Sequence, residues 1–477
     1  MFDLETVMFA FVLLAILLLV GRYLKRKTRL FQRLYLPESV IAGVLGLLLG
    51  PQVLGVMATA IAGPDAPLAG GVFPESILAV WSQSPKVFIN VVFASLLLGE
   101  AIPSLDQVWR KAAPQVVFGM TLGFGQYVVA ALVTLLILIP VFGVSPIAAS
   151  LIEISFAGGH GTAGGMIEVF NQLDFPDGGD LSLGLATVSL VTSIVLGTAL
   201  ANWGRRKGYV ANANPDVAEP KDIPSLHLEE PLEVSRQRQR LLQNLLMDPL
   251  SINFGVVALA IAVGWLILEA LKWIEAITWG RDGFALFPFV PLFPLALIGG
   301  ILTQIAFNRT GRSALISRPM IQNIGGLALD VVITTAIATM SLTAIGNNLA
   351  VFLILAVTGV LWVVLVFLWW APRIFPSFWF EKGIADFGQA MGVTSTGIIL
   401  IRMVDPANRS GAFESFAYKQ IFFEPLLGGG LITAISPVLI AQWGLPTFLV
   451  IMAVVLLFWF MAGFLLIRQQ RRRAPIV

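Results

Sequence analysis

The chain has 477 residues, of which 57% are hydrophobic and only 12% are charged, and its formal net charge is +2. Soluble domains carry about 25% charged residues, so this composition excludes an ordinary soluble domain and indicates a polytopic membrane protein. The sequence contains no cysteine, which excludes thiol catalysis, disulfides and cysteine-ligated metal centres. We therefore expect the lipid bilayer, and no nucleic acid, as a partner.

Apolar runs need roughly 20 residues to cross a bilayer. Such runs lie, in chain order, at 6–21, 39–62, 86–102, 115–140, 181–203, 249–271, 288–307, 320–342, 348–371, 420–442 and 447–467. The first run is expected to stay as a membrane span, because no basic region precedes it and Arg22–Arg29 follows it. Two further apolar runs, 147–173 and 378–402, are interrupted by small polar residues.

The basic residues predict the orientation, because Lys and Arg collect on the cytoplasmic side. The cluster after the first run places the N-terminus outside, and Arg205-Arg206-Lys207 must lie inside. Both conditions hold only if 147–173 enters the membrane from outside and returns there as a re-entrant hairpin. The same reasoning makes 378–402 a hairpin that enters from the cytoplasm. Of the 30 lysines and arginines, this arrangement leaves only Lys86, Lys272 and Arg281 outside.

The two halves of the chain form a weak internal repeat. Ala157–Gly161 aligns with Gly388–Gly392, and Asn90 aligns with Asp330. The predicted fold is an all-α polytopic membrane protein with an inverted five-plus-five repeat and two re-entrant hairpins. We assign 1–203 to the first repeat, 204–247 to a cytoplasmic linker, 248–443 to the second repeat, and 444–477 to an extra span with a basic, cytoplasmic tail. Inverted repeats with broken segments in matching positions are the sequence signature of a secondary transporter.

The glycine-rich stretch Ile154–Phe170 is the most informative part of the sequence. Glycine costs about 1 kcal/mol relative to alanine inside a helix. Lipid cannot satisfy the backbone groups that a helix break sets free, so such a break belongs inside protein or beside a watery cavity. Transporters place their substrates at breaks of this kind.

The first hairpin, Ser155-Phe-Ala-Gly-Gly-His-Gly-Thr-Ala-Gly164, resembles the glycine motif Gly-Gly-His-Gly-Thr-Gly of the sodium/glutamate symporter (ESS) family. Leu36-Pro-Glu-Ser-Val-Ile-Ala-Gly43 is similar to that family's Ile-Pro-Glu-Pro-Val-Ala-Gly segment, and Gln126 lies where the family carries a glutamine. The resemblance covers residues 1 to about 443, and a more distant one links the chain to the sodium/citrate carriers.

The resemblance implies sodium-driven uptake of glutamate by an elevator-like homodimer in a bacterial inner membrane, with Na+ as the co-transported ion. The second hairpin departs from the family pattern, because Gln389-Ala390 replaces a glycine position and Ser395 replaces a proline. The linker and the extra span are also additional. These departures leave the fold expectation intact, while citrate or a dicarboxylate, coupled to sodium or protons, remains an alternative substrate.

An acidic substrate needs partners for its carboxylates. Glycine-rich turns can present several backbone N–H groups to one carboxylate, and a half-helix adds its positive dipole end. The candidate substrate-binding residues are Ser155, Gly158, Gly159, His160, Gly161, Thr162, Asp386, Gly392, Thr394, Ser395, Thr396 and Arg402. Each has a structural alternative, since membrane glycines also allow close helix packing and hydroxyls often bond their own helix.

Intramembrane charges are a second guide, because placing one at mid-helix costs about 2.5–3.5 kcal/mol even on the lowest scales. Asp330 and its repeat partner Asn90 are therefore candidate ligands for sodium or for the ammonium of the substrate. The alternative is a structural hydrogen bond between spans. Glu153 and Asp386 flank the hairpins, and either is expected to face the ammonium of the substrate or to lie at the membrane interface. In a proton-coupled carrier, Asp330 or Glu153 would carry the proton. Glu424-Pro425 is expected to be a kink near the inner end of the run 420–442.

Two other classes of function are less consistent with the sequence. An intramembrane enzyme lacks support, because there is no His-Glu-x-x-His or Gly-x-Ser-x-Gly motif, and the spacing of Glu153, His160 and Glu168 is not a usual metal pattern. A channel is the other alternative, because paired hairpins also build pores. Saturable, sodium-dependent uptake would distinguish a carrier from a pore.

Overall fold

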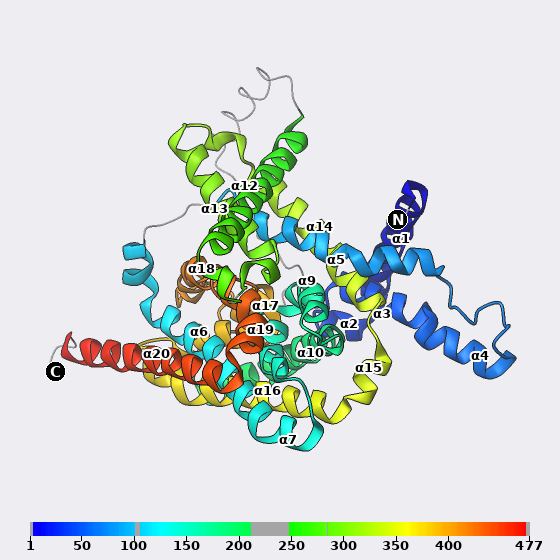
Figure 1. Ribbon diagram of the computed structural model, residues 1–477. Coiled ribbons are helices and arrows are strands. Elements are labelled where there is room, and N and C mark those ends of the chain that lie inside the picture. Colours follow the sequence, from blue (N-terminus) through cyan, green and yellow to red (C-terminus); the bar gives the residue numbers. More distant parts are fainter. Residues whose placement is uncertain (1–2, 101–104, 211–247, 284, 474–477) are drawn as a thin grey trace. The chain divides into compact units, whose positions relative to one another are not determined.

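The computed structural model describes residues 3–100, 105–210, 248–283 and 285–473 (Figure 1). The described residues form helices and contain no strand. Ten helices in this part of the chain are long and apolar enough to cross a membrane. The prediction of an all-α polytopic membrane protein is therefore confirmed. The predicted linker falls outside the described residues from position 211 to 247.

The chain divides into two compact units, which are described separately. The first unit comprises Met1–Phe88, Ser104–Ala211 and Asp330–Val477, and the second comprises Ile89–Pro103 and Asn212–Leu329. The boundary after Phe88 falls inside the long helix α5 (Glu75–Ser95), and the boundary before Asp330 falls inside the long helix α14 (Arg318–Ala338).

The N-terminal part of the first unit packs α1 (Leu4–Lys27), α3 (Glu38–Leu49), the start of α5 and the end of α14 around a common apolar core. Trp81 Nε1 donates a hydrogen bond to Ala10 O at 2.9 Å. Small residues allow the helices to approach closely: a Cβ added at Gly43 would lie 2.8 Å from Ile337 Cβ. Such small-residue contacts are typical of helix packing in membranes. Shorter helices here are α2 (Arg29–Arg33) and α4 (Val56–Ala62).

The rest of the first unit is built around α6 (Leu105–Val133), which packs against α16 (Leu349–Ile374), α18 (Ala412–Phe423) and α20 (Leu445–Arg473). Trp362 Nε1 donates to Leu122 O at 2.9 Å and ties α16 to α6. The remaining helices are α7 (Ile139–Phe142), α8 (Leu151–Phe156), α9 (Gly159–Gln172), α10 (Asp177–Arg206), α15 (Leu342–Asn347), α17 (Trp379–Val404) and α19 (Leu431–Trp443).

The second unit contains the end of α5, α12 (Pro249–Ile277), α13 (Phe293–Arg309) and the start of α14. A Cβ added at Gly264 would lie 2.6 Å from Leu295 O, so glycine is needed for α12 and α13 to pack this closely. Arg318 anchors the start of α14 through an ion pair with Glu100 at 2.8 Å and hydrogen bonds to carbonyls at the end of α5.

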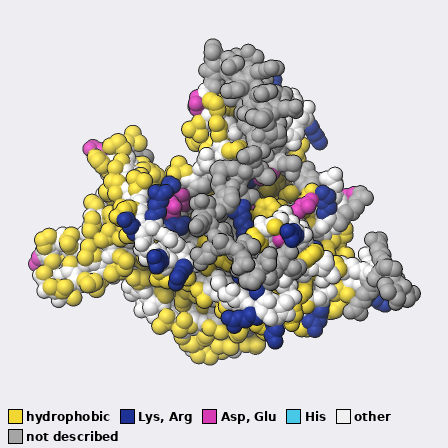
Figure 2. All heavy atoms as spheres, turned by 180° about the vertical axis from the view of Figure 1, so that it is seen from behind, with side chains coloured by type: hydrophobic (Ala, Val, Ile, Leu, Met, Phe, Trp, Pro, Cys, Tyr) yellow, Lys and Arg dark blue, Asp and Glu magenta, His cyan; other side chains and the backbone are white. Residues whose placement is uncertain are grey.

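Hydrophobic side chains gather over parts of the face seen in Figure 2. Exposed hydrophobic side chains also lie along α20, where Val454, Leu457 and Phe458 are each more than half exposed. Such residues belong in contact with lipid rather than water, because a soluble protein rarely exposes apolar patches of this extent. The exposed faces therefore support the membrane assignment independently of helix length.

One predicted span is wrong as a continuous helix. The apolar run 420–442 is interrupted, because α18 ends at Phe423, α19 begins at Leu431, and the residues between them are not helical. Pro425 cannot donate a backbone hydrogen bond, and Gly428 and Gly429 adopt positive φ angles of 65° and 103°. The kink expected at Glu424-Pro425 is thus a break of several residues.

Candidate functional site

The first helix break, residues 157–159, separates α8 from α9. Gly159 has φ +67°, a conformation that suits glycine and few other residues. A Cβ added at Gly158 would lie 2.5 Å from Ile154 O and 2.8 Å from Thr162 Cβ, so no larger residue fits there either. Gly158 precedes the first turn of α9 and no side chain caps this turn. The backbone N–H groups in the first turn of α9 are available to a ligand, since the first turn of a helix has no internal partners for them.

The second helix break is Gly392–Val393, where α17 loses its helical dihedral angles. A Cβ added at Gly388 would lie 2.7 Å from Gly397 Cα. In a continuous helix these two residues would be about 13 Å apart, at 1.5 Å per residue. The two arms of α17 therefore fold back beside each other, although the helix is long enough to count as one span. Val393 adopts φ +67°, which is a strained conformation for a β-branched residue.

The second break is held in place by side chains that bond its freed carbonyls. Gln126 Nε2 donates to Ala390 O at 2.6 Å, and Ser193 Oγ donates to Gly388 O at 3.3 Å. Thr396 donates its hydroxyl to Gly392 O. The glutamine noted in the sequence thus has a specific structural role on the second hairpin, and α6 and α10 both contribute to shaping it.

The third helix break, residues 424–430, lies next to the first. A Cβ added at Gly428 would lie 3.4 Å from Ala157 O. The fully buried carboxylate of Glu153 accepts hydrogen bonds from Tyr127 Oη at 2.7 Å, Gly428 N at 2.8 Å and Thr433 Oγ1 at 2.9 Å. With three donors, Glu153 is a clamp between the first hairpin and the third break. This structural role takes the place of the two expected from the sequence, contact with an ammonium or a position at the membrane interface.

The first and second breaks touch directly. A Cβ added at Gly159 would overlap Val393 Cγ1. Three interruptions of helical backbone, drawn from distant parts of the sequence, therefore gather within the first unit. Unwound backbone is tolerated at membrane depth only where it is buried in protein or lines a cavity, and it is where transporters bind solutes.

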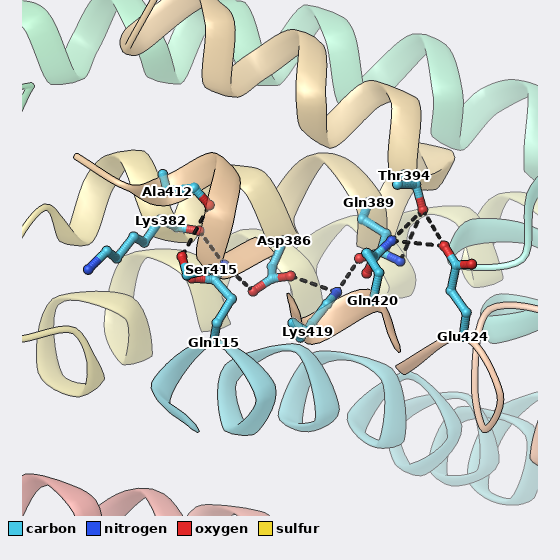
Figure 3. Close-up of polar contacts among 10 residues, drawn as sticks. All are labelled: Gln115, Lys382, Asp386, Gln389, Thr394, Ala412, Ser415, Lys419, Gln420 and Glu424. Carbon is cyan, nitrogen blue, oxygen red and sulfur yellow. Dashed lines mark hydrogen bonds and ion pairs between the residues drawn. The ribbon is translucent and has the colours of Figure 1, made fainter. Parts of the chain in front are cut away.

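A continuous track of polar side chains follows the second hairpin and α18 (Figure 3). Its centre is an ion pair between Asp386 Oδ1 and Lys419 Nζ at 2.8 Å, with each side chain only 1% exposed. Gln115 Nε2 donates to Asp386 Oδ2 at 2.8 Å, and Lys419 also donates to Gln389. Lys419 Nζ lies 4.1 Å from the centroid of the Phe423 ring, a cation–π contact.

The track continues from the ion pair to the third break. Gln389 Nε2 lies 3.5 Å from Thr394 Oγ1, which donates to Glu424 Oε1 at 2.9 Å. Gln420 Nε2 donates to Glu424 Oε1 at 3.0 Å and also to Thr394. Asp386 and Thr394, both predicted as site residues, are thus joined through side chains that the sequence reasoning did not select.

Several buried oxygen atoms around the breaks have no hydrogen-bond partner among the described residues. They are Ser155 Oγ and Thr162 Oγ1 at the first break and Gln126 Oε1 at the second, and all three residues are at most 1% exposed. Buried polar groups are nearly always satisfied, so each orphaned oxygen calls for an explanation, and a bound ligand is one. These atoms give independent support to a binding site at the breaks.

The remaining predicted substrate-binding residues lie at different distances from the breaks. His160 Nε2 and Thr187 Oγ1 share a hydrogen bond at 2.9 Å, so this side of the ring holds α9 on α10. Gly161 lies in the first turn of α9, beside the break. Ser395 is exposed. Arg402 lies in the last turn of α17, about 13 Å along the helix from Val393 at 1.5 Å per residue.

The two candidate sodium ligands fall in different units of the fold. Asn90 belongs to the second unit and Asp330 to the first. Asp330 lies on the part of α14 that packs on the start of α3, where Thr334 Oγ1 donates to Ser39 O at 3.1 Å. Across the described residues, no three His, Cys, Asp or Glu side chains gather as a metal site, and Glu153, His160 and Glu168 form no such group.

Lys419 is the most important residue that sequence reasoning missed. The apolar run 420–442 begins one residue after Lys419, so hydropathy places Lys419 just outside the membrane as one more cytoplasmic cation. The available signal was the spacing of Ser415 and Lys419, four residues apart on one face of α18, which Gln115 and Asp386 meet.

No protein-family model and no curated protein matches this sequence.

Proposed function

We propose that the protein is a secondary active transporter for a small acidic solute, with the solute bound where the three helix breaks meet. The observation that carries this proposal is the direct contact of Gly159 with Val393, flanked by the orphaned hydroxyls of Ser155 and Thr162. Uncapped N–H groups at the start of α9 add positive dipole and favour a carboxylate. The ends of two folded-back hairpins provide a site that can open to either side by alternating access.

The particular activity that we propose is sodium-coupled symport of L-glutamate, as the resemblance to the sodium/glutamate symporters implies. The proposal includes an elevator-like movement, a homodimer, two re-entrant hairpins, and an inner-membrane location with the N-terminus outside and the C-terminus in the cytoplasm. Sodium is here the co-transported ion, and no enzymatic activity is expected. The altered second hairpin makes aspartate, citrate and dicarboxylates the appropriate competitors.

Uptake into liposomes tests the proposal. Purified protein is reconstituted, and accumulation of radiolabelled glutamate is followed with and without an inward sodium gradient. We expect saturable, sodium-dependent accumulation above the equilibrium level, which a pore cannot produce. Accumulation of citrate or aspartate instead would retain the transporter and change its substrate. Equilibration without accumulation, at a rate that does not saturate, would contradict a carrier.

Substitution of Gly161 by a bulky residue tests the location of the site. Gly161 lies in the first turn of α9, so a Trp there is expected to abolish uptake while expression and size-exclusion behaviour stay normal. Normal transport by Gly161→Trp would place the solute elsewhere.

A further inference from the structure

The polar track ends in a group of oxygen atoms that the solute site leaves unused. Thr394 Oγ1, Gln420 and Glu424 Oε1 lie within hydrogen-bond distance of one another, where the second hairpin meets the third break (Figure 3). Thr394 directly follows the positive-φ residue Val393, and Glu424 is the first residue of the third break. The group therefore combines a carboxylate, a hydroxyl and an amide with two stretches of unwound backbone.

Gln420 supplies an independent sign of a ligand. Gln420 is 8% exposed, and its Oε1 has no hydrogen-bond partner among the described residues. The oxygen and nitrogen of a glutamine amide exchange places on a half-turn of the side-chain end. After that turn, the Gln420 oxygen would face Thr394 Oγ1 and Glu424 Oε1, and three oxygen atoms would converge on one point.

The charges nearby favour a cation at that point. The track holds two carboxylates, those of Asp386 and Glu424, and one buried ammonium, that of Lys419, which lies 2.8 Å from Asp386 and also interacts electrostatically with Glu424. Lys382 joins the track through its backbone carbonyl, which accepts from Gln115, and Figure 3 shows its side chain directed away from Asp386. Hard cations such as Na+ prefer oxygen ligands from carboxylates, hydroxyls and carbonyls, and in transporters unwound backbone supplies further oxygens.

We propose that Thr394, Gln420 and Glu424 bind the co-transported sodium ion, in place of the Asn90 and Asp330 pair suggested by the repeat. The inference rests on the proposed function for the ion's role, but the site itself can be tested without transport. Its position gives the coupling a physical basis: an ion at Thr394 would hold the third break against the second hairpin, whose Val393 contacts Gly159 of the first.

Sodium binding to the purified protein is the decisive measurement. Thermal unfolding is followed against NaCl, with choline chloride holding the ionic strength constant, and 22Na+ binding is measured on the same sample. We expect NaCl to raise the unfolding temperature of the wild type. Glu424→Gln should raise the half-saturating sodium concentration by about tenfold or more, since the affinity of oxygen sites depends strongly on ligand charge. Thr394→Val, which keeps the side-chain shape, should raise this concentration by a smaller factor.

Two matched variants control the experiment. Glu414→Gln makes the same substitution on α18, the helix that ends directly before Glu424, at a carboxylate that is 62% exposed and lies outside the group, and should leave sodium binding unchanged. Asp330→Asn should do the same. If Glu424→Gln does not yield monodisperse protein, the sodium affinity of Thr394→Val tests the site.

The outcomes separate the ion site from the transport function. Wild-type sodium affinity in both Glu424→Gln and Thr394→Val would overturn the site, and its loss in Asp330→Asn would restore the earlier candidate. A wild type without sodium binding whose uptake follows a proton gradient would also overturn the site. Failure of glutamate uptake, with Glu424-dependent sodium binding intact, would count against the proposed substrate and leave the ion site standing.

Discussion

Removing one member of the buried Asp386–Lys419 pair should destabilise the protein strongly. Both side chains are 1% exposed and their charged atoms lie 2.8 Å apart. Lys419→Met leaves Asp386 buried with one remaining hydrogen bond to its carboxylate, from Gln115 at 2.8 Å. An uncompensated buried charge costs about 3–5 kcal/mol in the free energy of unfolding. Asp386→Leu should cost a similar amount, because it leaves the ammonium of Lys419 without its carboxylate.

The double variant is the informative member of this series. Replacing both charges by apolar side chains removes the desolvation cost of each, and such replacements are often neutral. Gln115 and Gln389 then each lose a partner, at about 1–3 kcal/mol for a buried group left unsatisfied. We therefore expect Asp386→Leu/Lys419→Met to recover at least part of the summed loss of the two single variants, giving a clear interaction energy in a double-mutant cycle.

Unfolding in mixed micelles by titration with SDS measures these free energies. The control is the exposed pair Lys111–Glu414, which joins α6 at 3.4 Å to α18, the helix that also carries Lys419. Lys111→Met should change stability very little, because solvent-exposed ion pairs contribute little. A loss of stability in Lys419→Met as small as that in Lys111→Met would contradict a coupled buried pair, and so would simple addition of the losses of the two buried single variants.

Two further substitutions test the contacts at the breaks. Gly159→Ala should lower stability by about 1–3 kcal/mol more than Gly143→Ala. Both glycines have φ near +65°, but only Gly159 lies against Val393, and overpacking adds a cost of that size. Thermal unfolding and uptake measure the difference, and equal losses of stability in the two variants would contradict the contact. Tyr127→Phe removes a hydrogen bond to the carboxylate of Glu153 and should lower the free energy of unfolding by about 1.5–3 kcal/mol. Hydrogen exchange in residues 428–433 should become faster, because Glu153 holds the backbone N–H of Gly428. Unchanged exchange would mean that Glu153 is not a clamp.

The positions of the first two helix breaks were predictable because glycine has a local effect on the backbone. The run Ala157–Gly161 marked the first break to within two residues, and Gly388–Gly392 marked the second. The alignment of the two runs was less accurate. It set Gly392 against Gly161, whereas the positive φ angles fall at Gly159 and Val393, because a β-branched residue rarely adopts this conformation and gives no signal of it in the sequence.

The two halves also differ where the repeat predicted similarity. In the first half a single helix, α10, follows the hairpin, whereas in the second half α18, the third break and α19 take its place. The apolar character of 420–442 hid this difference, since hydropathy reports burial in lipid and not the course of the backbone. Pro425 and the glycines at 428–430 were the residues that should have divided the run.

Composition and hydropathy by themselves determined that this is a helical membrane protein and where its helices give way to glycine, because both depend on residues close together in the chain. Tertiary structure alone decided which polar groups meet. Gln115 and Asp386 are 271 positions apart, and Glu153 and Gly428 are 275 positions apart. Such pairs form because a buried charge or an interrupted helix must find partners inside the protein, and which partners lie within reach depends on how distant helices pack.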